Sequence, residues 1–364
     1  MNIPPEILKS RLALFQEKFM EKGVDAVMLR TLSSFMYFTG TKWLRPALLI
    51  PGEGEPIAFV ARGEEDGFRK KTWIRNVVTF VDGGDLMAKV SSLIRNSGYR
   101  VVGLEFGVER DAYILFYEMF KRLNPRVRVV DVYPITSEMR MIKDRYEQEA
   151  IRRAGKLASE AMERALSAVK INYSETEIAA EAYSFLYKQG SESPLVYVNV
   201  GPDPRVHAEP FSDVLVKEGV FVTVIIGADY RGYYANISRT VYVGKPKKIV
   251  ENALKCMDEV YELSRDLTKP KSRFMDVIKK LEGVYLKYNL IEERVVGYAH
   301  GIGLQIEEPP ITTIIPKHRF IEIRPNMALA LVHSPLMLKG LGQVKKEDTF
   351  IVREDGGLEQ VTGA

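Results

Sequence analysis

The stretch VTVIIGADYRGYYANISRTVYV, from Val222 to Val243, decides the fold. It opens with a run of β-branched and apolar residues and returns with aromatic residues at Tyr233 and Tyr234. Two such runs separated by a glycine-containing segment predict a β-hairpin, because glycine adopts the positive φ of a tight turn at little cost. We expect the turn to lie at Gly227–Asp229.

Composition indicates an ordinary globular protein of two domains, since the 364 residues can bury a large core. Apolar residues make up 46% of the chain and charged residues 27%, and no apolar run approaches the roughly 18 residues of a membrane span. The start, MNIPPEILKSR, does not resemble a signal peptide, so we expect a cytoplasmic protein without a membrane partner. The single cysteine, Cys256, excludes an internal disulfide, and a net charge of +4 gives no indication of nucleic-acid binding.

Residues 1–135 alternate between strand and helix patterns. Apolar residues recur at helical spacing over residues 5–22, before Gly23. A short helical stretch up to Gly40 and further helices near 84–97 and 109–122 are also predicted. The predicted strands are DAVMLR, RPALLIP, PIAFVA, NVVTFV, RVVGLEF and RVRVVDV. This alternation predicts an α/β domain with a mostly parallel, mixed sheet.

Residues 136–364 have a different pattern and predict an α+β domain. Helical periodicity runs for more than four turns from Ala150, and Ser174 with Glu177 forms a capping box at the start of the next helix. Two more helices are predicted near 247–265 and 272–286, and strands dominate from about 295. Helices covering one face of a largely antiparallel sheet are typical of an α+β layer.

Five motifs in order carry a resemblance to a known superfamily: VHAEP, the hairpin ending in ISRT, HGIG, NM and EDT. They resemble motifs of prolidase, aminopeptidase P and creatinase, which share the pita-bread fold. The phrases EKGVDAVMLRTLSSFMYFTG and SEMRMIKDRYEQEAIRRA resemble the N-terminal domain and linker helix of the same proteins. The resemblance implies a creatinase-type N-terminal domain, a pita-bread C-terminal domain and a homodimer.

The resemblance also implies a centre of two manganese, cobalt or zinc ions, held by two aspartates, one histidine and two glutamates. The matching positions here are Ile225, Asn236, His300, Val332 and Glu347. Only His300 and Glu347 retain the ligand, because isoleucine and valine cannot bind a metal and asparagine is a neutral, weaker ligand. We therefore expect no dinuclear site and no other cofactor.

Several residues are candidates for catalysis or substrate binding. His207 matches a family histidine of the substrate pocket, and Glu307 replaces another one. His207, His300 and Glu307 are the catalytic candidates, and Arg239 joins them as a candidate for substrate binding. Two of the site residues also have a purely structural interpretation. His300 would be a buried histidine with all its hydrogen bonds satisfied, and Glu347 would pair with Arg239 or another cation instead of a metal.

His333 is the one apparent replacement ligand. Strand alternation directs its side chain to the face opposite Val332, and only a local bulge would reverse this. We therefore do not expect His333 in the site.

Three functional hypotheses follow. The first is a prolidase-like protein with a degenerate metal site that binds a peptide, a small molecule or a protein in its cleft. The second is a metal-independent hydrolase similar to creatinase, with His207 as general acid and base. The third is an Xaa-Pro peptidase with one metal held by His300, Glu347 and an unforeseen ligand.

Overall fold

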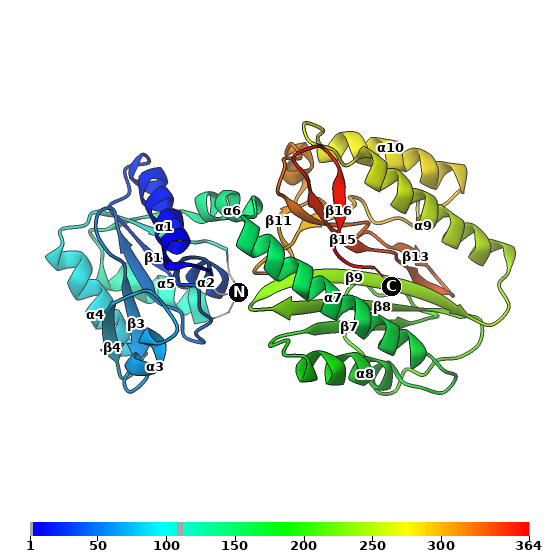
Figure 1. Cartoon of the computed structure of the whole chain (residues 1–364), viewed down its shortest axis with the longest axis horizontal. Coiled ribbons are helices and arrows are strands. Elements are labelled where there is room, and N and C mark those ends of the chain that lie inside the picture. The colour runs from blue at the N-terminus through cyan, green and yellow to red at the C-terminus, as the bar shows by residue number, and fades with distance from the viewer. Residues whose placement is uncertain (1–2, 108, 110–111, 364) are drawn as a thin grey trace. The chain divides into compact units, whose positions relative to one another are not determined.

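The computed structural model describes residues 3–107, 109 and 112–363. The chain divides into two compact units, Met1–Arg140 and Met141–Ala364 (Figure 1). Each unit contains its own sheets and its own apolar core.

The first unit is built on one six-stranded sheet in the order β4-β3-β2-β1-β5-β6. Its strands are β1 (Ala26–Leu29), β2 (Leu48–Pro51), β3 (Ile57–Ala61), β4 (Asn76–Phe80), β5 (Val101–Leu104) and β6 (Arg128–Asp131). Its helices are α1 (Pro5–Met20), α2 (Leu32–Thr39), α3 (Glu65–Arg69), α4 (Gly83–Asn96), α5 (Ala112–Leu123) and α6 (Tyr133–Met141), the last of which crosses into the second unit. Strand β1 pairs antiparallel with β2 and parallel with β5, which confirms a mixed α/β sheet.

The expected elements of this unit are present, and two short helices, α3 and α6, were not expected. All four residues of β1 are buried, as expected of a central strand with both faces covered. The helix expected near 109–122 is α5, and residues 108, 110 and 111 lie outside those described.

The second unit places four helices on antiparallel sheets. The helices are α7 (Arg145–Ser167), α8 (Glu175–Lys188), α9 (Lys248–Leu267) and α10 (Phe274–Lys287), with a 3₁₀ turn at Pro316–Phe320. One sheet has the order β7-β8-β9, another β11-β10-β12-β15-β16, and β13 pairs with β14. The strands are β7 (Leu195–Val200), β8 (Val220–Tyr230), β9 (Tyr233–Val243), β10 (Ala299–Gly301), β11 (Glu308–Ile311), β12 (Ala328–Leu331), β13 (Leu336–Leu338), β14 (Gly342–Val344), β15 (Asp348–Val352) and β16 (Leu358–Gln360).

Helices α8, α9 and α10 begin within two residues of their predicted starts, whereas α7 begins at Arg145, five residues before the predicted periodicity. Ser174 is the N-cap of α8: its side chain accepts from the Glu177 amide at 3.2 Å, and the Glu177 carboxylate accepts from the Ser174 amide at 2.7 Å. This confirms the predicted capping box. Helix α7 packs against β8 and β9, and α8 packs against β7 (Figure 1). Within the described residues, no helix combines the length and the apolar character that crossing a bilayer requires.

The hairpin of β8 and β9 turns at a different place from the one expected. The turn residues are Arg231 and Gly232, with φ of 52° and 80°, and Gly227 lies inside β8 opposite Asn236. Two consecutive positive φ angles match the twist of a two-residue hairpin, so the turn forms there. Gly227 has another role, because a Cβ at this position would lie 2.1 Å from Cδ1 of Ile306. The glycine admits the Ile306 side chain over the strand.

Alternation along β8 and β9 divides their residues between two faces. Val224, Ile226 and Ile237 belong to the apolar core that includes residues of α7 and α8. Ile225 and Asn236 therefore lie on the opposite face. On that side Ser238 exchanges two backbone hydrogen bonds with Glu347, 3.0 and 3.2 Å long, so β9 runs beside the start of β15.

Candidate functional site

Three histidines and two glutamates of the second unit converge into one group, which we call the histidine cluster: His207, His300, Glu307, His333 and Glu347. His333 is its centre. Its Nδ1 lies 2.9 Å from Glu347 Oε1, and its Nε2 lies 3.2 Å from Glu307 Oε1. Its ring lies 4.5 Å from that of His300 and 4.9 Å from that of His207, measured between centroids.

The histidine cluster runs from a buried end to an open end. The His300 and Glu347 side chains are completely buried. At the other end the side chains of His207 and Glu307 are 34% and 19% exposed, and His207 Nε2 lies 3.1 Å from Glu307 Oε1. A ligand from solvent can therefore reach His207 and Glu307 but not the buried pair.

The expectation for His333 is wrong, and the local backbone explains why. Val332, just beyond the end of β12, has a φ of 63°, in the left-handed region that β-branched residues rarely adopt. This rotation breaks strand alternation. Val332 packs in the apolar core with residues of α9 and α10, and His333 takes the place in the site that the sequence predicted for Val332.

Lys345 is a further residue of the candidate site that was not predicted from the sequence. Its side chain is 1% exposed, and its Nζ lies 3.0 Å from Glu347 Oε2 and 3.2 Å from His333 Nδ1. A signal was available, because residues two apart on an extended segment share a face, and Glu347 follows Lys345 by two. Lys345 is thus the cation that pairs with Glu347.

Arg239 does not pair with the Glu347 side chain. Its guanidinium binds both carboxylate oxygens of Asp348, at 3.0 and 3.1 Å, and donates to the Glu347 carbonyl oxygen at 3.0 Å. The Asp348 carboxylate also accepts from the hydroxyls of Tyr261 and Thr362, at 2.6 and 2.7 Å. Arg239 therefore binds the start of β15 beside Glu347, and its role in substrate binding stays a prediction.

Both glutamates of the histidine cluster are held ionised. Burial by itself would raise the pKa of Glu347, but the Lys345 ammonium and the histidines beside it bring that pKa well below its ordinary value of 4.5. Burial by itself would also raise the pKa of Glu307. The hydrogen bond from His207 and the charges of His300 and His333 outweigh burial and lower that pKa to about 2. Both groups are hydrogen-bond acceptors at neutral pH.

The pKa values of the two buried histidines, His300 and His333, are shifted in opposite directions. Burial and the nearby Lys345 ammonium lower the pKa of His333 to about 4. Burial also acts to lower the pKa of His300, but its contact with Glu347 and the charge of Glu307 outweigh burial and raise it above 6.5. His300 Nδ1 lies 2.9 Å from the Gly301 carbonyl oxygen, and its Nε2 lies 3.5 Å from Glu347 Oε1, which is long for a hydrogen bond.

The residues at the five family positions do not fit two divalent ions. Ile225 is buried on the site-facing side of β8 and offers no ligand atom, and Val332 is turned into the core. Asn236 is buried, and its Oδ1 has no hydrogen-bond partner within the described part of the chain. Glu347 is the one carboxylate among these positions, and Lys345 already neutralises it. Two ions held close together require several carboxylates to offset their repulsion.

Neighbouring contacts position the open end of the histidine cluster. Glu308, which follows Glu307, forms a buried ion pair with Lys143, with its Oε1 2.7 Å from the Lys143 Nζ. His207 has a φ of 50°, a left-handed conformation that costs free energy in a non-glycine residue. Its ring lies 5.8 Å from that of Tyr197, measured between centroids. The pair of His207 and Glu307 is thus presented by anchored segments.

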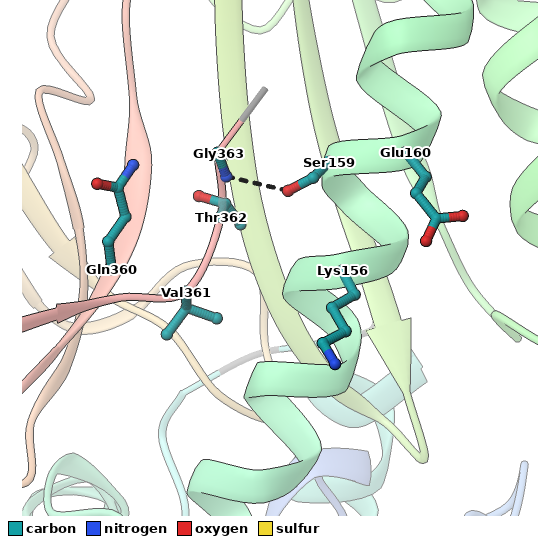
Figure 2. Close-up of a pocket in the computed structure, with 7 residues that line it drawn as sticks. All are labelled: Lys156, Ser159, Glu160, Gln360, Val361, Thr362 and Gly363. Atoms are coloured by element: carbon teal, nitrogen blue, oxygen red, sulfur yellow. Dashed lines mark hydrogen bonds between the residues drawn. The ribbon is translucent and has the colours of Figure 1, made fainter.

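A separate hollow of about 450 Å³ lies between α7 and the C-terminal segment. Figure 2 shows Lys156, Ser159 and Glu160 on α7 beside residues 360–363, with the Gly363 amide donating to Ser159 Oγ at 3.0 Å. The segment can lie this close to α7 because residue 155 is a glycine. A Cβ at this position would be only 2.5 Å from the Val361 carbonyl oxygen. None of the histidine cluster lines this hollow.

Comparison with known proteins agrees with this architecture. Residues 149–354 match metallopeptidase family M24, and residues 11–142 match the creatinase/prolidase N-terminal domain. The Xaa-Pro dipeptidase of Pyrococcus furiosus is 23% identical over 357 residues, covering 96% of this chain and 97% of that protein. Ectoine hydrolase of Halomonas elongata is 24% identical over 307 residues, covering 76% of each.

Solved structures show the same fold. The prolidase from Pyrococcus horikoshii OT3 superposes with a TM-score of 0.87 at 21% identity, over 98% of each chain. The Xaa-Pro dipeptidase from Bacillus anthracis has a TM-score of 0.85 at 22% identity, also over 98% of each chain. These likenesses confirm the creatinase-type N-terminal domain and the pita-bread C-terminal domain. With the match across residues 149–354, they mean that this chain belongs to metallopeptidase family M24.

Proposed function

We propose that this chain does not hydrolyse Xaa-Pro peptides with a dinuclear metal centre. We propose instead that it binds a peptide or a small molecule at the open end of the histidine cluster. The observation that carries the first part is the position of Lys345, whose Nζ lies 3.0 Å from Glu347 Oε2. This ammonium already neutralises the carboxylate that a metal ion of the dinuclear centre would need as a ligand.

The charge at the buried end supports this proposal. Each ion of a metal pair brings two positive charges, and the carboxylates around it must offset them. Lys345 already matches the single charge of Glu347, and Ile225 and Asn236 add none. An ion placed there would meet the Lys345 ammonium without a compensating carboxylate.

The open end supports ligand binding. The low pKa of Glu307 keeps its partly exposed carboxylate ionised, and His207 beside it offers a ring nitrogen. An ionised carboxylate accepts hydrogen bonds from amide N–H groups and from an amino terminus. The Tyr197 ring adjoins His207 and adds an apolar surface. A short peptide with a free amino group matches these features.

Two measurements on the same protein test the proposal. Hydrolysis of Met-Pro and Leu-Pro is followed with added manganese or cobalt, and binding of the two peptides is followed by calorimetry. We expect negligible turnover and measurable binding that Glu307→Gln weakens. Turnover of roughly 1–1000 per second that a chelator abolishes would contradict the first part. Absence of binding to any short peptide would contradict the second part.

One observation favours a second candidate, a metal-independent hydrolase similar to creatinase. His207 Nε2 lies 3.1 Å from Glu307 Oε1, and a carboxylate beside an imidazole supports general acid and base catalysis. The relative named ectoine hydrolase is named for a small-molecule substrate rather than a peptide. A screen of small amides in chelator tests this candidate: turnover should be lost in His207→Ala. Turnover that survives this change would remove His207 from the mechanism.

A further inference from the structure

The open end of the histidine cluster has the composition of a mononuclear metal site. His207, Glu307 and His333 each offer one ligand atom, and these atoms lie within 4.8 Å of one another. The Glu307 Oε1 is 3.1 Å from His207 Nε2 and 3.2 Å from His333 Nε2. Ligand atoms of a tetrahedral zinc ion with bonds of about 2.0–2.1 Å are separated by roughly 3.3 Å, so both distances are close to those of a bound ion.

The contacts of His333 allow a tautomer whose Nε2 can bind a cation. A neutral imidazole has one N–H, but both ring nitrogens of His333 face carboxylate oxygens, Glu347 at 2.9 Å and Glu307 at 3.2 Å. If Nδ1 carries the proton and donates to Glu347, Nε2 directs its lone pair at Glu307; if Nε2 carries the proton and donates to Glu307, Nδ1 accepts from the Lys345 ammonium at 3.2 Å. A second ring proton would place a positive charge 3.2 Å from the Lys345 ammonium. A metal ion between Nε2 and Glu307 suits the form in which Nδ1 carries the proton, because it takes the Nε2 lone pair that would otherwise face the carboxylate.

The buried contacts of His333 complete the arrangement. Metal-binding histidines commonly donate their other N–H to a carboxylate, which fixes the tautomer and orients the ring. Glu347 is that carboxylate for His333, at 2.9 Å from Nδ1. Glu347 is in turn held by Lys345, at 3.0 Å. The ligand therefore has an outer partner that is itself anchored.

The same charges distinguish the open end from the buried end. His300, His333 and Glu347 also bring ligand atoms within 4.8 Å of one another. However, Lys345 lies 3.0 Å from Glu347 and 3.2 Å from the His333 nitrogen that such an ion would use. At the open end the ion pairs of Glu307 Oε1 among the described residues are with His207 and His333, at 3.1 and 3.2 Å. The buried end thus holds a fixed ammonium against the ligand atoms that an ion would need, whereas the described ion pairs of Glu307 involve histidines, whose neutral rings can bind a metal.

We propose that His207 Nε2, His333 Nε2 and Glu307 Oε1 together bind one divalent transition-metal ion such as zinc or cobalt, with Glu347 as the outer carboxylate. None of these three residues stands at a family metal position, and this site revises the expectation of no metal. The exposure of His207 and Glu307 leaves a coordination position open to water or to a ligand oxygen. The inference does not rest on peptide binding, because metal binding is measured without peptide. It excludes His207 as a general base, since the metal takes the lone pair that a base would use.

Calorimetry with zinc tests the proposal on the full chain, without an affinity tag and after treatment with chelator. We expect one equivalent of zinc to bind, and one equivalent of cobalt to give the visible absorption of a tetrahedral site. Loss of an outer partner costs about 10–100-fold in metal affinity, so His207→Ala and Glu307→Gln should each weaken binding by roughly 100-fold or more. Both side chains are partly exposed, and circular dichroism checks that the variants fold.

Two histidines provide the controls. His318 lies outside the histidine cluster and accepts from the Ile311 amide at 3.0 Å, so His318→Gln should leave zinc binding unchanged. His300→Gln removes a ligand of the buried end only, so zinc binding should persist. Loss of binding in His300→Gln with retention in His207→Ala would place the ion at the buried end and overturn the proposal. Absence of zinc binding, or binding that no histidine variant changes, would also overturn it.

Discussion

Removal of the Lys345 ammonium is the change that tests the buried end of the site most directly. Lys345→Met keeps the length of the side chain and removes its charge, which leaves the Glu347 carboxylate without its cation. The two side chains are 1% and 0% exposed, so water does not replace the lost interaction. Breaking a buried ion pair by removal of one partner costs about 3–5 kcal/mol. We expect a loss of that order in the free energy of unfolding of the second unit.

The loss is visible in thermal unfolding. For a domain of 150–250 residues each 1 kcal/mol shifts the Tm by about 2–4 °C, so the expected decrease is on the order of 6–20 °C. Differential scanning calorimetry of the full chain measures it. Hydrogen exchange of the β15 amides then identifies the transition that belongs to the second unit.

Two further variants make the result interpretable. Adding Glu347→Gln to Lys345→Met removes both charges, so we expect it to recover most of the lost stability. Lys346→Met is the matched control: Lys346 pairs with Asp258 at 2.7 Å, and the two side chains are 33% and 62% exposed. A pair this exposed contributes about 0–1 kcal/mol. If Lys345→Met and Lys346→Met destabilise the protein equally, Lys345 does not neutralise a buried carboxylate and our account of the site is wrong.

Three other predictions test the site and the assembly. The pKa of His333 is about 4 in the folded chain against an ordinary 6.5, so the unfolded state binds the proton first and stability should fall as the pH decreases from 6.5 to 4. With chelator present, His333→Gln should reduce the loss of unfolding free energy between pH 6.5 and 4 by on the order of 3 kcal/mol, measured by urea unfolding. An unchanged dependence of the unfolding free energy on pH would contradict this prediction. Ile225→Asp and Asn236→Asp combined with His333→Glu should bind manganese and raise the Tm, whereas the same pair with Val332→Glu should unfold, because Val332 faces the core. The chain should be a homodimer at micromolar concentration, and sedimentation equilibrium giving a mass near 41.3 kDa would contradict this.

Local patterns in the sequence were sufficient for most of the architecture. Periodicity, the Ser174 capping box and the strand runs each depend on neighbours within a few residues, and these predictions are confirmed. The predicted position of the hairpin turn was wrong. Gly227 resembles a turn residue in sequence, but the structure requires a glycine there for another reason. The Ile306 side chain, from a distant part of the chain, packs where a Cβ of residue 227 would be.

Tertiary structure alone decided which side chains form the site. The sequence by itself determined that Ile225 and Asn236 cannot replace aspartates, because ligand chemistry depends on residue type. It could not determine that His333 points into the site, since the left-handed φ of Val332 breaks strand alternation. Nor could it reveal that His333 lies against Lys345 and Glu347, because those contacts need β12 and β15 paired side by side. Alternation and spacing are local properties, whereas the charges of this site are matched only where distant segments pack together.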